Sequence, residues 1–128
     1  MAWIKQTVDS SIGGKLIVAL TGLALVGFIV GHLSGNLLIF AGRDAINTYA
    51  ETLRKYPALL WGARLGLIAA AAAHIFFTIK LNLRNRAARP ERYIKKNFAR
   101  ASLQSRTMVL SGLVLIFYAV FHLAHLTW

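Results

Sequence analysis

Histidines are the residues in this sequence whose type and spacing could do chemistry. His32, His74 and His122 each lie deep inside a different apolar segment, and His125 follows His122 by about one helical turn. A charged side chain at membrane depth costs about 2.5–3.5 kcal/mol even on lenient insertion scales, so such residues mark functional sites by default. A neutral imidazole still needs partners for its two ring nitrogens. One histidine in each of three successive segments therefore predicts metal ligation, and the metal that we expect is the iron of a haem.

The composition places these histidines in a membrane protein. Hydrophobic residues make up 57% of the 128 residues, which is more apolar surface than a soluble domain of this length can bury. The sequence contains no cysteine, which excludes disulfides, thiolate-ligated clusters and covalently attached haem. Any haem must therefore be bound non-covalently. The net charge of +11 is unevenly distributed, so it does not predict a nucleic-acid partner.

Three apolar segments predict an all-α, integral membrane helical bundle. The spans cover about residues 14–41, 58–83 and 107–128, each longer than the ~20 residues that a membrane-crossing helix needs. Residues 42–57 form a polar loop whose apolar residues recur at helical spacing, which favours a short helix on the membrane surface. Residues 84–106 form a basic loop. We expect residues 1–128 to be a single transmembrane haem-binding domain.

The distribution of basic residues predicts the orientation. Nine of the fifteen lysines and arginines lie between Lys80 and Arg106, where Glu91 is the only acid. Because loops rich in lysine and arginine stay on the cytoplasmic side, we expect the basic loop and the N-terminus to be cytoplasmic. The loop at residues 42–57 is then on the outer side of a cytoplasmic (inner) membrane, which the chain crosses several times.

The helical rise places two of the histidines at one depth. His32 lies 17 residues beyond Lys15, which is roughly 25 Å at ~1.5 Å per residue. His122 lies 15 residues beyond Thr107, which is roughly 22 Å by the same rise. Both imidazoles are therefore expected in the outer half of the membrane, where they could be the two axial ligands of one low-spin haem.

The other two histidines are less constrained. His74 is six residues from Lys80, roughly 9–12 Å from the inner surface by the helical rise, so it has no partner at its own depth. Its second ligand would come from another polypeptide or from further helices, or His74 binds nothing. His125 can face the same side as His122, so either of them could be the ligand.

Polar residues near these positions are candidates for bonds to an imidazole or to haem propionates. Ser34 and Asn36 closely follow His32 and could bond its second nitrogen, as ligating histidines require. Gly27, Gly31 and Gly35 clear one stripe of the first span, for a planar ligand or equally for another helix. Hydroxyl, amide and cationic side chains near the inner surface suit the propionates of an inner haem: Ser11, Lys15, Ser102, Gln104 and Arg106.

Several stretches carry a resemblance to a known family. The sequence contains GHLSGNL, WGARLGL, LRNRAARP and YAVFHLAHLTW within longer matching runs that cover nearly the whole chain. These stretches resemble the cytochrome b-558 membrane anchor of succinate:quinone oxidoreductases (succinate dehydrogenase and fumarate reductase), in the form that carries two haems b. The resemblance implies a bundle of five transmembrane helices, of which residues 1–128 hold three. It also implies a complex with a flavoprotein and an iron–sulfur subunit.

The resemblance also assigns roles to the histidines. His32 and His122 resemble the distal-haem ligands, in agreement with their matched depth, and His74 resembles one ligand of the proximal haem. The second proximal ligand is on the family's fourth helix, which is not among residues 1–128. The resemblance favours His122 over His125.

The expected function follows from these assignments. The chain would transfer electrons between the iron–sulfur subunit and a quinone, menaquinone or ubiquinone, in contact with membrane lipid. It would be no enzyme on its own, because it contains no flavin or nucleotide fingerprint. Glu51 is a candidate for accepting quinol protons, with a solvated surface acid as the alternative. Two other functions are kept open: a small histidine-lined protein that conducts protons or cations, and a structural anchor without haem.

Overall fold

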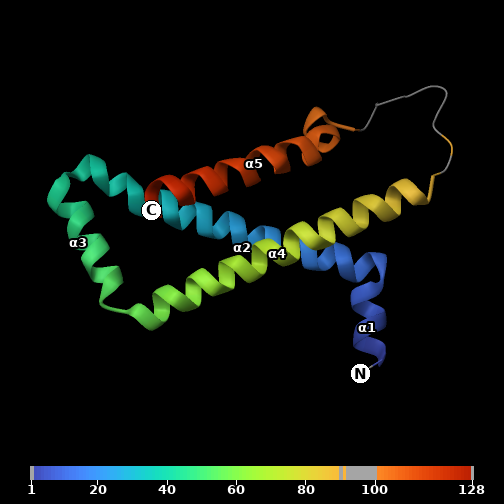
Figure 1. Cartoon of the computed structure of the whole chain (residues 1–128), viewed down its shortest axis with the longest axis horizontal. Helices are drawn as coiled ribbons and strands as arrows, with labels where there is room; N and C mark the ends of the chain where they lie inside the picture. Colours follow the sequence, from blue (N-terminus) through green and yellow to red (C-terminus); the bar gives the residue numbers. More distant parts are fainter. Residues whose placement is uncertain (1, 90, 92–100, 128) are drawn as a thin grey trace. The chain divides into compact units, whose positions relative to one another are not determined.

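The computed structural model in Figure 1 describes residues 2–89, 91 and 101–127. All regular secondary structure in these ranges is helical, which confirms the all-α class. The chain divides into two compact units, residues 1–90 and residues 91–128. The first unit contains α1 (Ala2–Asp9), α2 (Ser11–Asn36), the 3-10 segment η1 (Leu37–Ala41), α3 (Arg43–Arg54) and α4 (Pro57–Ala87), and the second contains α5 (Leu103–Thr127).

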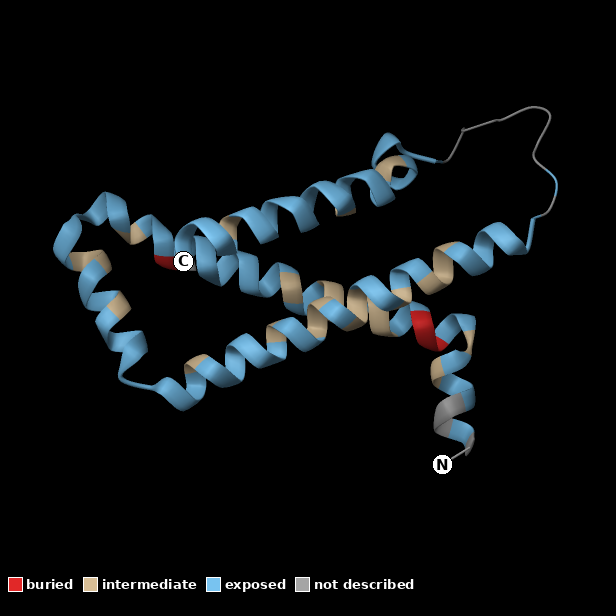
Figure 2. Cartoon of the chain, in the orientation of Figure 1, coloured by how far each residue is buried: buried red, intermediate tan, exposed pale blue. Residues whose placement is uncertain are grey.

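Three helical segments are long and apolar enough to cross a membrane, as the sequence predicts. They are Ser11–Ala41, Pro57–Ala87 and Leu103–Leu126. Even the shortest, at 24 residues, is about 36 Å long at the helical rise, more than the ~30 Å of bilayer hydrocarbon. No large apolar side chain in the described residues is buried, and Figure 2 shows these helices exposed along most of their length. Apolar surface of this extent needs lipid or partner helices to cover it.

The first span begins earlier than predicted and ends at Ala41, as predicted. The helix starts at Ser11 rather than near residue 14, because the Ser10 hydroxyl accepts a hydrogen bond from the Gly13 N–H at 2.9 Å and caps its first turn. Its last residues tighten into η1, and the turn to α3 follows at Gly42. There φ is +113°, a conformation that favours glycine.

The predicted basic loop at 84–106 is shorter than expected at both ends. Helix α4 continues past residue 83 to Ala87, since nothing before Pro90 prevents arginine and asparagine from remaining helical. Helix α5 begins at Leu103 instead of residue 107, with Ser102 just before it accepting a hydrogen bond from the Ser105 N–H at 3.2 Å. Residues 90 and 92–100 of this loop lie outside the described residues.

The polar segments on either side of α2 also form helices. Residues 2–9 form α1, and α3 confirms the helix predicted within residues 42–57. Pro57 opens α4 at its first turn, where a missing N–H is no loss. The fold of the first unit is therefore two long helices, α2 and α4, with a short amphipathic helix α3 between them in the chain (Figure 1).

Candidate functional site

Helices α2 and α4 cross in antiparallel directions along the first half of α2 (Figure 1). At Gly14, an added Cβ would lie 3.3 Å from the Leu81 side chain, and at Gly22 it would lie 3.0 Å from Cε1 of His74. Small residues let helix backbones approach closely in membranes. The crossing therefore depends on Gly14 and Gly22, and it brings His74 against the backbone of α2.

The half-buried imidazole of His74 is held by α2. Its Nδ1 lies 3.1 Å from the Val18 carbonyl oxygen and 3.1 Å from the Thr21 hydroxyl oxygen. The Thr21 hydroxyl also lies 2.6 Å from the Ile17 carbonyl oxygen, to which it donates its one hydrogen. Both groups facing Nδ1 are therefore acceptors, so Nδ1 carries the proton and donates it to them.

The protonated Nδ1 determines what the other ring nitrogen can do. A neutral imidazole protonated at Nδ1 has a lone pair at Nε2. Within the described residues, no hydrogen bond involves Nε2 of His74. A histidine that donates one N–H to a backbone carbonyl and leaves the other nitrogen available has the arrangement typical of metal ligands. This donor chemistry fits one axial position of a haem.

His32 has a different environment. Its side chain is exposed, and its ring stacks on Phe28 with centroids 5.3 Å apart. The Asn36 amide nitrogen lies 3.4 Å from Nε2 of His32 and donates a shorter bond, 2.7 Å, to the His32 backbone oxygen. Asn36 thus contacts a ring nitrogen of His32, as the sequence suggests. The contact is at the long end of the hydrogen-bond range, and a metal bound at Nε2 would take its place.

The two histidines of α5 each stack on an aromatic ring one turn earlier. The ring of His122 lies 5.6 Å from that of Tyr118, and the ring of His125 lies 5.6 Å from that of Phe121. His122 is half-buried and His125 is exposed. Because α5 belongs to the second unit, the pairing of His32 with His122 across one haem stays a prediction.

The remaining predicted site residues lie at the surface, on helices or, for Ser102, just before α5. The Ser34 hydroxyl donates to the Val30 carbonyl of its own helix at 2.8 Å. Glu51 is exposed on α3 and forms no ion pair with a described residue. The candidates for propionate contacts are all exposed, two of them in the first unit and three in the second: Ser11 and Lys15, and Ser102, Gln104 and Arg106. Their roles stay predictions.

The sequence reasoning missed the partners of His74. Val18 contributes a backbone carbonyl, which no side-chain pattern reveals. Thr21, however, lies six residues after Lys15 and His74 six residues before Lys80, so the depth argument applied to His32 also places these two at one level. The aromatic residues four positions before His32, His122 and His125 were also detectable from i, i+4 spacing: Phe28, Tyr118 and Phe121.

Comparison with known proteins adds no identification. No protein family, curated protein or solved structure matches this chain. Among the described residues, no three His, Asp or Glu side chains gather as they would around a bare metal ion. A haem iron takes its protein ligands from one or two side chains, so the relevant geometry is that of the individual imidazoles.

Proposed function

We propose that this chain is the haem b-binding membrane anchor of a succinate dehydrogenase or fumarate reductase complex, transferring electrons between an iron–sulfur subunit and a quinone. The observation that carries the proposal is the environment of His74. An imidazole inside an apolar helix donates Nδ1–H to the Val18 carbonyl at 3.1 Å and keeps a lone pair at Nε2. The resemblance of the sequence to two-haem cytochrome b-558 anchors supplies the identity of the complex.

The residues have separate roles in this proposal. His74 would be one ligand of the haem nearer the cytoplasm, whose second ligand comes from outside residues 1–128. His32 and His122 would hold the outer haem. Haem iron supplies one-electron redox chemistry, and the chain fixes ligand orientation and excludes water from the path. Val18 and Thr21 contribute by keeping the proton of His74 on Nδ1.

The proposed location is the cytoplasmic membrane, with the N-terminus on the cytoplasmic side. The excess of lysine and arginine between Lys80 and Arg106 supports this orientation. On that side Lys80 donates to a carboxylate oxygen of Asp9 at 2.6 Å, and the Arg84 guanidinium donates to the Asp9 backbone oxygen. These contacts connect α1 to α4, on the side where the iron–sulfur partner would bind.

The test is to purify the chain from membranes with its native partners and to record reduced-minus-oxidised absorption spectra. The proposal predicts low-spin haem b bands and co-purification of a flavoprotein and an iron–sulfur protein. A colourless preparation from haem-replete cells, without such partners, would contradict it. Proton or cation flux through vesicles containing that colourless protein would then favour the conducting alternative, and no flux would favour a structural anchor.

A further inference from the structure

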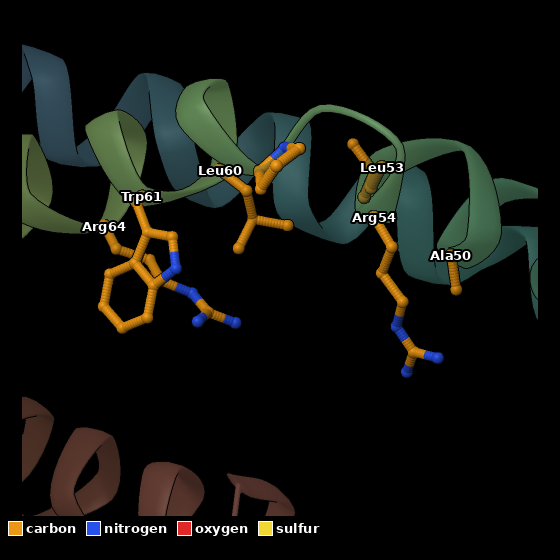
Figure 3. A pocket seen from close by; sticks show the side chains of 7 residues that line it. Ala50, Leu53, Arg54, Leu60, Trp61 and Arg64 are labelled. Carbon is orange, nitrogen blue, oxygen red and sulfur yellow. The ribbon is translucent and has the colours of Figure 1, made fainter.

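A groove lies where α3 meets the start of α4, at the opposite end of α4 from the His74 crossing. Its volume is about 380 Å³, and it is open to the surroundings. Both helices contribute to it, and both belong to the first unit. The groove is lined by Ala50, Leu53, Arg54, Pro57, Leu60, Trp61 and Arg64 (Figure 3).

The lining combines two cations with apolar side chains. Arg54 ends α3 and Arg64 lies two turns into α4, and neither forms an ion pair with any described residue. In Figure 3 both guanidinium groups extend in the same direction from their helices. No acidic side chain lines the groove. Its electrostatic character is therefore that of an anion site, and its walls suit hydrocarbon.

The position along α4 favours an anion that is held at the membrane surface. Arg64 lies seven residues beyond Pro57, about 10 Å along the helix at its rise, in a segment apolar enough to cross a membrane. A guanidinium at that level reaches toward the headgroup region, where phosphodiester groups lie. Its carbon is 5.1 Å from the ring centroid of Trp61, and tryptophan prefers that same interface.

We propose that this groove binds one anionic phospholipid. Arg54 and Arg64 would hold the phosphodiester through charge-assisted hydrogen bonds, and Leu53, Leu60 and Trp61 would contact the upper part of an acyl chain. A free phosphate ion would satisfy the arginines but leave the apolar wall without a ligand. A phospholipid is therefore the occupant that would contact both the arginines and the apolar wall of the groove. This proposal does not depend on haem binding.

The experiment uses Trp61 as the reporter. The full chain carrying W3F and W128F, with Trp61 as its one tryptophan, is reconstituted in phosphatidylcholine vesicles containing a minor fraction of brominated lipid. Bromine quenches tryptophan at contact. We expect stronger quenching by brominated phosphatidylglycerol than by brominated phosphatidylcholine at equal fraction, with about fivefold enrichment per arginine, which is the equivalent of ~1 kcal/mol per basic residue near a membrane surface.

Charge-matched variants show whether the groove is responsible. The double substitution Arg54→Gln with Arg64→Gln should abolish the enrichment. The control, Arg43→Gln with Lys55→Gln, removes the same charge near the two ends of α3 but from residues outside the groove lining, and should retain most of it. Equal quenching by the two lipids, or equal loss in both double variants, would overturn the proposal.

Competition identifies the occupant. Displacement of the brominated lipid by inorganic phosphate alone would assign the groove to a free anion, and displacement by a soluble quinone but not by unbrominated phosphatidylglycerol would assign it to quinone. Either result contradicts the lipid proposal. Native mass spectrometry of the unsubstituted chain provides the second measurement. We expect one retained phosphatidylglycerol that survives the control substitutions and is lost with Arg54 and Arg64.

Discussion

The two halves of α2 differ in how closely other helices approach their glycines. In the first half, Gly14 and Gly22 lie against side chains of α4, and the Val18 carbonyl and the Thr21 hydroxyl accept the Nδ1 proton of His74. In the middle of the second half, a Cβ added at Gly27 or Gly31 would meet no described atom within 4 Å, whereas one added at Gly35, near the end, would lie 2.6 Å from the Tyr49 hydroxyl oxygen of α3. The same helix thus has one segment that α4 covers, one with open glycines, and an end that α3 covers.

The difference shows how a membrane chain can orient a ligand. The imidazole of His74 is oriented by hydrogen bonds to a second helix, α2. These bonds fix the direction of the ring and keep its proton on Nδ1. His32 stacks on Phe28 and contacts Asn36, each one turn away on the same helix. The Phe28 and Asn36 contacts lie within α2 and do not depend on its association with α4. The α2–α4 crossing therefore fixes the ring of His74 through contacts between two helices, which is the arrangement that its proposed role requires.

The largest predicted effect comes from adding a large side chain at a glycine in each half of α2. G22L places a branched side chain where even a Cβ lies 3.0 Å from His74, so we expect it to lower the free energy of unfolding by about 1–3 kcal/mol. G27L is the matched control, with the same gain in helix propensity and open space around its Cβ, and should be at least as stable as the unsubstituted chain. Denaturant titration of helicity in detergent measures both. Equal losses would show that the crossing does not depend on Gly22.

A smaller effect tests the hydrogen bond across the crossing. Replacing Thr21 by valine keeps the shape and removes the hydroxyl that His74 contacts, so we expect a loss of about 0.6 kcal/mol, typical of interhelical hydrogen bonds in membranes. Thr107→Val is the control, because that hydroxyl donates to the Leu103 carbonyl of its own helix at 3.0 Å. The same titration compares the two variants. A loss in Thr107→Val as large as in Thr21→Val would contradict the assignment.

The smallest effect concerns the ion pair beside the crossing. Asp9→Asn removes the carboxylate that Lys80 contacts at 2.6 Å, but these side chains are 47% and 25% exposed. Exposed pairs contribute at most about 1 kcal/mol and are screened by salt. We therefore expect a small loss of stability at low ionic strength that disappears in high salt. Glu51→Gln, which removes an exposed carboxylate without an ion pair in the described residues, should show no such salt dependence. If the loss of stability in Asp9→Asn persisted in high salt, the ion pair with Lys80 would not be the interaction that attaches α1 to α4.

The helical class and the apolar spans could be predicted from the sequence, because long runs such as residues 16–41 have no charge and only one plausible environment. The helix ends could not, since they depend on local caps such as Ser10 and on arginine-rich turns that remain helical until Pro90. Among the site residues, the histidines could be predicted because an ionisable residue in an apolar span is unusual. The bond from His74 to the Val18 carbonyl could not be predicted, because it joins residues 56 positions apart through a backbone atom.

The measurement that tests the central claim most directly is the haem content of histidine variants of the purified complex, with the reduced spectrum of each. The account predicts that His32→Ala and His122→Ala remove the same haem, that His74→Ala removes the other, and that His125→Ala keeps both. Full haem content in the His32, His74 and His122 variants would contradict it, and so would a loss in His125→Ala that matches the loss in His122→Ala.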